Sequence, residues 1–412
     1  MVFADLEARA AALDAADPLA PRRGLFHLPE GVIYLDGNSL GALPLSVPGR
    51  IAAVLREEWG EGLIRSWNEA GWIDLPARVA AKIARLIGAE PNAVLVGDST
   101  TVNVFKTLDA ALRLVPDRRV VLTDSGNFPT DIYAAEGLAG LRAGGFEIRI
   151  VRPDEVASAI GDDVAVVMLT EVDYRTGRRH DMKAITAHAH AAGAVTLWDL
   201  AHSAGALPVD LVGAGADFAV GCGYKYLNGG PGAPAFLYVA PRHLGSVTPA
   251  LPGWLGHAAP FAFDLGYRPA PGIERMRTGT PGVLGVAALD AALDVFEGVD
   301  MAVVAEKAAR LAGLFVEGVE RACRDLVLAG PRDPALRGSQ VSFHAEEGYA
   351  VMQALIARGV IGDFRAPDIV RFGFTPLYVS HRDAVRAAAT LAAVVNERLW
   401  DEPRFKVKAK VT

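Results

Sequence analysis

Two residues of opposite charge follow apolar, strand-like runs in the middle of the sequence. Asp199 closely follows the run Val195–Leu197, and Lys225 follows Phe218–Val220, 26 residues after the aspartate. A lysine in a partly dry pocket has a lowered pKa and can form a Schiff base. A carboxylate that leaves an apolar strand needs a cationic partner, and a protonated pyridine nitrogen would supply one. The pair therefore suits pyridoxal 5′-phosphate, with Asp199 on the pyridinium and Lys225 on the aldehyde carbon.

Both residues also have simpler interpretations. Asp199 could cap the next segment or form a structural ion pair, and a lysine in a loop is most often exposed. Lys225 is, however, flanked by Tyr224 and Tyr226 and followed by Leu-Asn-Gly-Gly-Pro-Gly, which is unusual for a surface loop. The cofactor interpretation is favoured because both residues follow a strand, and open α/β sheets bind ligands at the carboxyl ends of their strands.

A third apolar run, Val94–Val96, is followed by Gly-Asp-Ser-Thr-Thr-Val-Asn, where a helix is expected to begin. Hydroxylated residues at a helix N-terminus place N–H and O–H donors toward an anion, and the helix dipole adds to this attraction. Thr100 and Thr101 are therefore candidate phosphate ligands. Ordinary helix capping explains the same residues, because Ser and Thr are preferred at that position.

The elements that must position these residues alternate between strand and helix patterns. Apolar runs predict strands at Val94–Val96, Val120–Thr123, Val164–Leu169, Val195–Leu197, Phe218–Val220 and Phe236–Val239. Helical patterns over Asn103–Leu114 and Lys183–Ala192 separate several of them. This alternation predicts a mostly parallel α/β sheet. The last two runs are too close for a crossover helix, which favours one antiparallel strand.

The C-terminal part of the chain predicts a smaller α+β unit. Apolar residues between Val304 and Val319 recur at helical spacing. Further elements are expected as strands at Ser339–His344 and Val370–Gly373 and as helices at Tyr349–Arg358 and Ala384–Leu399. We expect residues 1–45 to pack with the small domain, residues 46–289 to form a large cofactor domain, and residues 290–412 to form the small C-terminal domain. The Pro- and Gly-rich stretch Pro249–Pro281 is expected to be an extended connector.

Composition excludes several classes of protein. The chain has 412 residues, with 41 Lys and Arg against 48 Asp and Glu, so its net charge of −7 argues against nonspecific nucleic-acid binding. No apolar run reaches the ~20 residues that span a bilayer, and the N-terminus does not resemble a signal peptide. Two cysteines cannot build a disulfide framework or a four-thiolate zinc site, and no histidine pair has a metal-binding arrangement. We expect a cytoplasmic protein without a metal, in which Cys222 is a packing residue.

Several segments together resemble those of kynureninases, a family of fold-type I pyridoxal-phosphate enzymes related to class V aminotransferases. The matching segments run from near residue 30 to near residue 375 and include YLDGNSLG at 34–41, WGEGLI at 59–64, FPTD at 128–131, DLAH at 199–202, YKYLNGGPG at 224–232 and RTGTP at 277–281. An Asp-x-x-His and a Lys alone occur in many aminotransferases and desulfurases, whereas the first, third and fifth segments are far more specific. The resemblance implies a large domain with a mostly parallel seven-stranded sheet and a small α+β C-terminal domain.

The resemblance also implies roles for individual residues. Lys225 is the expected Schiff-base lysine, Asp199 the pyridinium partner, and Tyr224 a phosphate ligand and candidate proton relay. Further expected cofactor contacts are Thr100, Thr101, Phe128 stacked on the ring, Asp131, Thr170 near the cofactor hydroxyl, and His202. Trp254 and Thr280 match phosphate contacts that the family takes from a neighbouring subunit, which implies a homodimer with the active site at its interface. Many relatives carry Asn where this chain has Thr280.

Substrate contacts are expected in two further segments. Arg371, in Val-Arg-Phe-Gly-Phe, matches the arginine that binds the substrate α-carboxylate, and a planar guanidinium suits that role. A structural salt bridge would explain the same arginine. Asn38 and Ser39 match a loop that lines the substrate pocket, although a simple Asx turn accounts for them equally well.

The implied reaction is the hydrolytic cleavage of the Cβ–Cγ bond of L-kynurenine, or of 3-hydroxykynurenine, to L-alanine and anthranilate or 3-hydroxyanthranilate. Two alternatives stay open at this point. A cysteine desulfurase-like lyase needs a catalytic cysteine in a late mobile loop, and Cys323 lies instead in a helix-like segment. A noncatalytic pyridoxal-phosphate protein would have no need of Asp199, Lys225 and Arg371 together.

Overall fold

The computed structural model describes residues 3–142 and 144–409, which divide into two compact units. Unit 1 comprises the described residues of Met1–Ser46, Arg175–Arg179 and Asp294–Thr412. Unit 2 comprises the described residues of Val47–Tyr174 and His180–Leu293. The predicted junctions follow residues 45 and 289, and the two units divide after Ser46 and Leu293. No pattern in the sequence predicted that the short segment Arg175–Arg179 belongs to unit 1.

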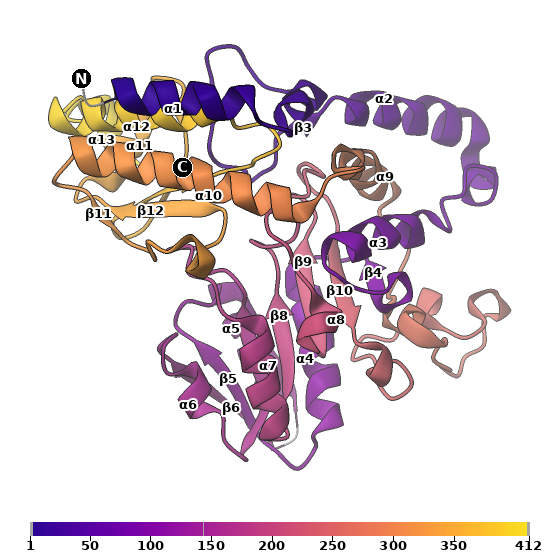
Figure 1. Cartoon of the computed structure of the whole chain (residues 1–412). Helices are drawn as coiled ribbons and strands as arrows, with labels where there is room; N and C mark the ends of the chain where they lie inside the picture. Colours follow the sequence, from indigo (N-terminus) through magenta and orange to yellow (C-terminus); the bar gives the residue numbers. More distant parts are fainter. Residues whose placement is uncertain (1–2, 143, 410–412) are drawn as a thin grey trace. The chain divides into compact units, whose positions relative to one another are not determined.

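Unit 2 is built on a seven-stranded sheet, within the described residues, whose order is β4-β10-β9-β8-β7-β5-β6 (Figure 1). The strands are β4 (Val94–Val96), β5 (Val120–Asp124), β6 (Glu147–Val151), β7 (Val164–Thr170), β8 (Val195–Asp199), β9 (Phe218–Cys222) and β10 (Ala235–Val239). Strands β5 to β9 run parallel, and β10 is antiparallel to both β9 and β4. The predicted mostly parallel sheet of seven strands is therefore confirmed, including its antiparallel strand.

Strand β6 is the one member of this sheet that no apolar run predicted. Its residues, Glu-Ile-Arg-Ile-Val, alternate polar and apolar side chains, and all five are at least partly exposed. It lies at the edge of the sheet, where only one neighbour covers it. The buried central strands are instead apolar on both faces, as parallel strands between helical layers must be.

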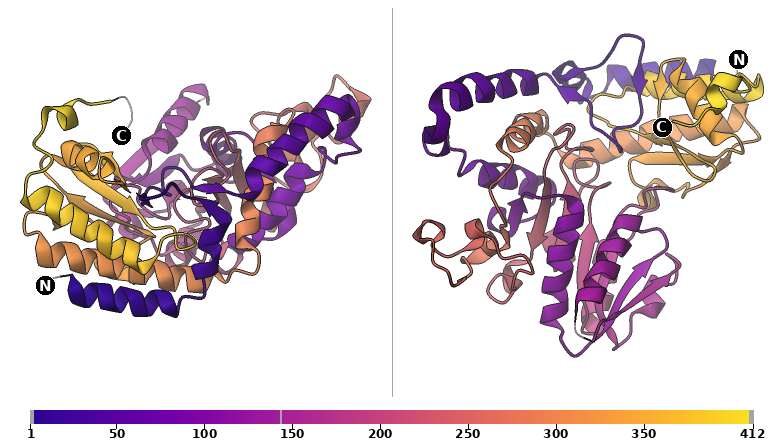
Figure 2. Two further views of the ribbon diagram at one scale, coloured as in Figure 1. Left: turned by 90° about the horizontal axis from the view of Figure 1, so that it is seen from above. Right: turned by 180° about the vertical axis from the view of Figure 1, so that it is seen from behind.

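Helices cover both faces of this sheet. Helices α4 (Thr100–Leu114) and α5 (Pro129–Leu141) pack side by side on one face, toward the viewer in the right-hand panel of Figure 2. Helices α6 (Val156–Ala159), α7 (Met182–Ala191) and α8 (Leu211–Ala214) lie on the other face. The face on which each helix lies follows from the right-handedness of the crossover connections. The connections β5-α5-β6 and β7-α7-β8 run in opposite directions along the strand order, so α5 and α7 lie on opposite faces. Val104 and Leu108 of α4 pack on the sheet residues of the core.

Unit 2 contains further helices outside the sheet. They are α2 (Ser46–Ala53), the π-helix η2 (Val54–Gly62), η3 (Leu63–Trp67), α3 (Leu75–Leu86), η4 (Pro91–Ala93), η5 (Pro241–His243) and α9 (Val283–Ala292), with η9 (Leu293–Phe296) at the junction. The expected connector contains three short 3₁₀ helices, η6 (Trp254–Gly256), η7 (Pro260–Ala262) and η8 (Gly272–Met276), joined by irregular segments.

Unit 1 packs helices against a small antiparallel sheet of order β11-β12-β15-β14. Its elements are α1 (Ala4–Ala15), η1 (Ala20–Leu25), β1 (Phe26–His27), β2 (Ile33–Tyr34), β3 (Leu43–Pro44), α10 (Met301–Ala322), β11 (Val327–Leu328), η10 (Pro334–Leu336), β12 (Gln340–His344), α11 (Gly348–Ile356), β13 (Val360–Ile361), β14 (Asp363–Arg365), β15 (Ile369–Gly373), α12 (His381–Asn396) and α13 (Pro403–Lys406). Leu6 and Ala10 of α1 pack against Leu314 and Val385, and β2 pairs with β13. The N-terminal segment is therefore part of this unit. None of the helices in residues 3–142 and 144–409 is long and apolar enough to cross a membrane.

Candidate active site

The carboxyl ends of β7, β8 and β9, together with the first turns of α4 and α5, surround a pocket of about 240 Å³ in unit 2. The residues that line it are Ser99, Thr100, Thr101, Phe128, Thr130, Asp131, Thr170, Tyr174, Asp199, Ala201, His202, Tyr224 and Lys225. The structure thus brings together every cofactor-binding residue expected from the sequence except Trp254 and Thr280. Open α/β sheets bind ligands at this edge because the loops diverge there.

Lys225 projects into the pocket from the loop after β9. Its Nζ lies 3.0 Å from His202 Nε2 and about 6 Å from two aromatic rings, at 5.8 Å from the centre of Phe128 and 5.9 Å from that of Tyr224. The loop closes on itself through a hydrogen bond from the Gly229 N–H to the Gly223 carbonyl oxygen. A Cβ atom on Gly229 would lie 2.8 Å from that oxygen, so only glycine permits this turn. The glycine-rich sequence therefore holds the lysine in place.

Asp199 is a buried carboxyl group with few partners. It is 6% exposed, and its Oδ1 accepts one hydrogen bond, 2.8 Å long, from the Ala201 N–H. Burial raises the pKa of Asp199, against the opposing effects of the Lys225 charge and the Ala201 N–H. Asp131 is also buried, and burial together with the nearby Asp199 charge raises its pKa well above the ordinary value. Two such carboxyl groups favour a bound cation or a shared proton.

The N-terminus of α4 forms a second wall of the pocket. Ser99 is the N-cap, and its Oγ accepts a hydrogen bond from the Val102 N–H at 3.4 Å. Thr100 and Thr101 follow in the first turn, where free N–H groups and the helix dipole favour an anion. The preceding Asp98 has a left-handed backbone (φ 56°) and binds the fully buried Lys106 at 2.8 Å. That ion pair neutralises a carboxylate that would otherwise repel an anion at the helix start.

The other predicted cofactor contacts occupy the side of the pocket near β7. Thr170 ends that strand, and its Oγ1 donates to the Val172 carbonyl oxygen at 3.1 Å. Phe128 immediately precedes α5 and packs edge-on against Tyr174, with ring centres 5.1 Å apart. Tyr174, Thr130 and Ser99 line the pocket but were missed in the sequence. Ser99 and Thr130 could have been found by position, because each lies at the start of a helix, whereas Tyr174 lies in the turn after β7.

The predicted substrate residues lie in unit 1, where they form one polar cluster. Arg371 is 1% exposed, and its Nε donates to Asp363 Oδ1 at 2.8 Å while its Nη2 donates to Asp363 Oδ2 and, at 2.8 Å, to Ser39 Oγ. Asn38 is buried beside them, and with its amide turned over its oxygen accepts from Arg371 Nε at 2.9 Å. Asp363 and Arg365 were missed, because they meet Arg371 only through the pairing of β14 with β15.

Two of the predicted cofactor-binding residues lie outside the Lys225 pocket. Thr280 lines a separate cavity of about 620 Å³ in unit 2 with Trp59, Trp72 and the segment Arg277–Val286. Trp254 is 42% exposed and packs edge-on against Phe261. Both residues were expected to act across a subunit interface, and that role stays a prediction.

Alternative chemistry finds little support at this pocket. Cys222 is buried, and burial raises the pKa of its thiol, which disfavours the reactive thiolate. Across the described part of the chain, His, Cys, Asp and Glu side chains form no group of three that could hold a metal ion.

The pocket residues fit pyridoxal 5′-phosphate. A buried carboxyl group short of donors matches a pyridinium N–H, and a lysine beside a histidine matches the aldehyde carbon. The start of α4 and Tyr224 match the phosphate, and the flat ring matches the face of Phe128. The partners required by each end of the cofactor are therefore present in one cavity.

Comparison with known proteins gives the family. The family model described as "Kynureninase C-terminal domain" matches residues 304–391. "Kynureninase" of Deinococcus radiodurans is 59% identical over 393 residues, which cover 94% of this chain and 95% of that protein. "Kynureninase" of Pseudomonas fluorescens is 52% identical over 408 residues, covering 97% and 98%. The chain belongs to the kynureninase family.

Among solved structures, the kynureninase fold of this chain resembles those of other pyridoxal-phosphate enzymes. A variant of the cystine C–S lyase C-DES, with glycine covalently linked to its PLP cofactor, superposes with a TM-score of 0.77 and 20% identity, covering 90% of this chain and 98% of that one. An apo cysteine desulfurase from Thermococcus onnurineus NA1 has a TM-score of 0.75 and 19% identity, covering 92% and 97%. These similarities confirm the fold. The kynureninase relatives, far more similar in sequence, argue against the desulfurase alternative.

Proposed function

We propose that this protein is a pyridoxal-phosphate-dependent hydrolase that cleaves the Cβ–Cγ bond of L-kynurenine, or of 3-hydroxykynurenine, with water. The products are L-alanine and anthranilate or 3-hydroxyanthranilate. The observation that carries the proposal is the pocket that gathers Lys225, Asp199, Asp131 and the α4 N-terminus at one edge of the sheet. Similarity over nearly the full length of relatives named kynureninase specifies the substrate.

Pyridoxal phosphate, when bound, supplies the electron sink that a C–C bond without a good leaving group requires. Asp199 holds the proton on the pyridine nitrogen, because a carboxylate buried with one hydrogen bond gains most from a cationic partner. Lys225 is the base that removes the proton from the substrate Cα. His202, 3.0 Å from Lys225 Nζ, is placed to share that proton. Water adds to the γ-carbonyl carbon of the substrate, which becomes the carboxyl group of the aromatic product when the Cβ–Cγ bond breaks, and Tyr224 is the proposed proton relay.

Arg371 is the proposed ligand of the substrate α-carboxylate, supported by its burial and its fixed guanidinium geometry. Ser39 and Asn38 contact the same guanidinium and are proposed to line the substrate site. A planar guanidinium matches the two oxygens of a carboxylate, which favours an amino acid as the substrate.

We further propose that the enzyme is a homodimer in which Trp254 and Thr280 complete the cofactor site of the partner. Support comes from the exposure of Trp254 and of the apolar residues Trp59, Leu63 and Ile64 on unit 2, at 42%, 57%, 60% and 77% respectively. Apolar surface of this kind marks interaction sites. Both cysteines are free, which supports a reducing compartment such as the cytoplasm.

The decisive experiment measures anthranilate release by absorbance when the purified, cofactor-loaded protein is mixed with L-kynurenine. A parallel reaction contains 3-hydroxykynurenine, and L-alanine is quantified in both. We expect equal amounts of L-alanine and aromatic product. Absence of product from both substrates would refute the proposed function.

A further inference from the structure

A fully buried lysine supports the start of α4, the helix whose first turn lines the Lys225 pocket. Lys106 lies in the second turn of α4, and its side chain is 0% exposed. Its Nζ reaches back to the loop before the helix, where it binds Asp98 Oδ2 at 2.8 Å and lies 3.5 Å from Asn103 Oδ1. Burial lowers the pKa of Lys106, and the Asp98 carboxylate opposes that shift. Asp98 is therefore the group that keeps the buried lysine charged.

Asp98 is fixed beside the helix start by contacts that do not involve Lys106. It directly precedes Ser99, the N-cap of α4, and its backbone is left-handed, with φ at 56°. Its carbonyl oxygen accepts from the Ala235 N–H at 3.0 Å. Its carboxylate accepts from Thr278 Oγ1, which lies 2.9 Å from Oδ1 and 3.2 Å from Oδ2. The carboxylate would therefore stay near the start of α4 if Lys106 lost its charge.

The balance of charge at this point affects any anion that binds to the helix. Thr100 and Thr101 begin α4 and line the Lys225 pocket. The start of a helix attracts an anion with the equivalent of roughly half a positive charge. A full negative charge on Asp98, two residues before Thr100, would outweigh that attraction. The charge of Lys106 cancels it, so the attraction of the helix start for an anion is preserved.

We propose that Lys106 is a positioning residue for the cofactor phosphate: it holds and neutralises Asp98, so that the start of α4 attracts the phosphate group of pyridoxal phosphate. Lys106 acts from behind the site, because it is not one of the residues that line the pocket. The inference rests on the proposed function in one respect, since it places the phosphate at the start of α4. It does not depend on the reaction that follows.

The test replaces Lys106 by methionine, which keeps the length of the side chain and removes its charge. The full-length protein is loaded with pyridoxal phosphate or with pyridoxal, the same ring without the phosphate. Each dissociation constant is measured from the visible absorbance of the lysine-bound ring against the concentration of free ligand. We expect Lys106→Met to weaken pyridoxal phosphate binding roughly tenfold to hundredfold and pyridoxal binding by less than about threefold, because only the phosphate is repelled by Asp98.

Removal of the carboxylate as well should restore binding. The double variant Lys106→Met with Asp98→Asn carries neither charge, and asparagine tolerates a left-handed backbone as aspartate does. It should bind pyridoxal phosphate within about threefold of the wild type, a strongly non-additive result for two neighbouring residues. A double variant as weak as Lys106→Met, or equal weakening of both ligands by Lys106→Met, or of neither, would overturn the proposal.

Lys307→Met is the matched control. Lys307 of unit 1 is also buried, and its Nζ binds the carboxylate of Asp17 at 2.7 Å. Its replacement should lower the thermal stability of the protein and leave the ratio of the two dissociation constants unchanged. Asp98→Asn alone guards against misfolding of Lys106→Met. It should bind pyridoxal phosphate at least as tightly as the wild type, and selective weakening of that ligand would contradict the proposed role.

The same measurements distinguish failure of this inference from failure of the proposed function. If the wild-type protein binds pyridoxal phosphate but forms no anthranilate, the proposed reaction fails, and the ratio of dissociation constants still decides the role of Lys106. If the wild-type protein binds pyridoxal phosphate no more tightly than pyridoxal, the phosphate site at the start of α4 is refuted, and this inference with it.

Discussion

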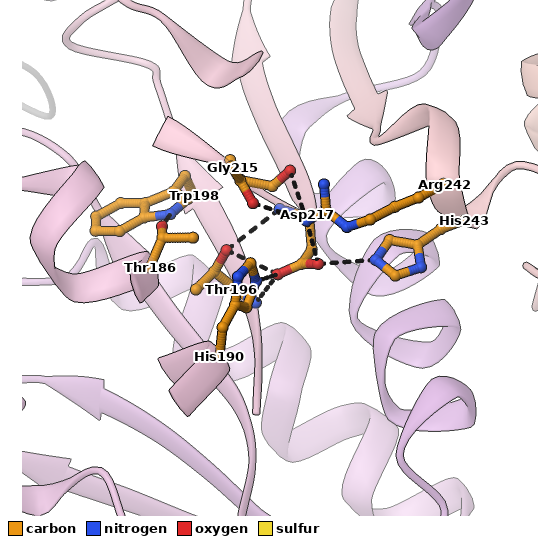
Figure 3. Close-up of polar contacts among 9 residues, drawn as sticks. Thr186, His190, Thr196, Trp198, Gly215, Asp217, Arg242 and His243 are labelled. Carbon is orange, nitrogen blue, oxygen red and sulfur yellow. Dashed lines mark hydrogen bonds and ion pairs between the residues drawn. The ribbon is translucent and has the colours of Figure 1, made fainter. Parts of the chain in front are cut away.

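Two buried aspartates lie beside neighbouring strands of the large sheet, one at the carboxyl ends of the strands (the carboxyl edge) and one at their amino ends (the amino edge). Asp199 ends β8 at the carboxyl edge, and Asp217 immediately precedes β9 at the amino edge. The Asp199 carboxylate accepts one hydrogen bond from a backbone N–H. The Asp217 carboxylate accepts hydrogen bonds from His190, His243, Arg242 and Thr196 at 2.6–3.2 Å (Figure 3). The two groups share a sheet and a degree of burial but differ in their partners.

The difference in partners reverses the pKa shift. Burial alone would raise the pKa of both carboxyl groups. At Asp217 the hydrogen bonds from His243 and His190 outweigh burial, and the pKa falls below the ordinary value. At Asp199 burial prevails and the pKa is raised. A buried charge with every partner supplied by the fold stabilises the protein, whereas one left short of partners is available to a ligand.

The largest effect is expected at the carboxyl edge, from Lys225→Ala. Loss of this amine removes both the covalent link to the cofactor and the base at Cα. Activity should fall by roughly 10⁴-fold or more, and the visible absorbance of the lysine-bound cofactor should disappear. Lys183→Ala, at an exposed position on α7, is the control. Persistence of a borohydride-reducible adduct on another lysine would remove Lys225 from its proposed role.

Asp199→Asn, at the same ends of the strands, should lower activity without lowering stability. The amide cannot hold the pyridinium charge, so kcat is expected to drop by about 10²–10³-fold, as for other removals of an electrostatic partner. Unfolding of the cofactor-free protein should occur at an equal or higher temperature, because a poorly paired buried carboxyl group is replaced by a neutral one. Steady-state kinetics and thermal unfolding test the two halves. Normal kcat would show that Asp199 is a structural residue like Asp217.

Asp217→Asn should produce the opposite pattern at the amino edge. Two histidines and Arg242 lose their shared anion, so the free energy of unfolding should decrease by about 3 kcal/mol, while kcat per folded enzyme stays within about twofold. The folded-state pKa is lowered, so the stabilisation is present above the unfolded pKa of about 3.9 and is lost as the pH falls through the lower folded value. Denaturation measured from pH 7 downward should therefore show the wild type and variant converging in acid. A difference that does not depend on pH would contradict this account.

The sequence predicts which residues gather at the carboxyl ends of the strands better than it predicts contacts between side chains on neighbouring strands. Asp199, Lys225 and Thr101 could be found because each follows an apolar run, and parallel strands bring their ends together without further information. The position of β6 could not, since an edge strand lacks the continuous apolar pattern of buried strands. The contact of Asp363 with Arg371 could not either, because it depends on the register of β14 against β15, which local patterns do not specify.

The amino-edge cluster illustrates the same limit. Thr196 lies on β8 and Asp217 immediately precedes β9, whereas His190 comes from α7 and His243 from η5. Nothing in the local sequence of these residues indicates that they meet. Pattern analysis therefore favours ligand sites at strand ends and overlooks the networks that hold the opposite edge together.

Asp36 provides the smallest and most specific test, because burial raises its pKa, as at Asp199, while several polar groups oppose that shift, as at Asp217. Burial and the Asp363 charge raise the pKa of Asp36 to about 7, while Arg371, Ser39 and Arg365 oppose that shift. Tyr34 also lies close enough for the Asp36 charge to raise the pKa of the tyrosine. Deprotonation as the pH rises through 7 adds a negative charge beside Arg371 and should weaken binding of the substrate carboxylate. The KM for L-kynurenine should rise about two- to fivefold between pH 6 and pH 8, a size typical of a partly screened charge. Asp36→Asn should remove that rise and keep the low-pH KM, whereas an identical pH profile in both proteins would show that this carboxyl group does not face the substrate.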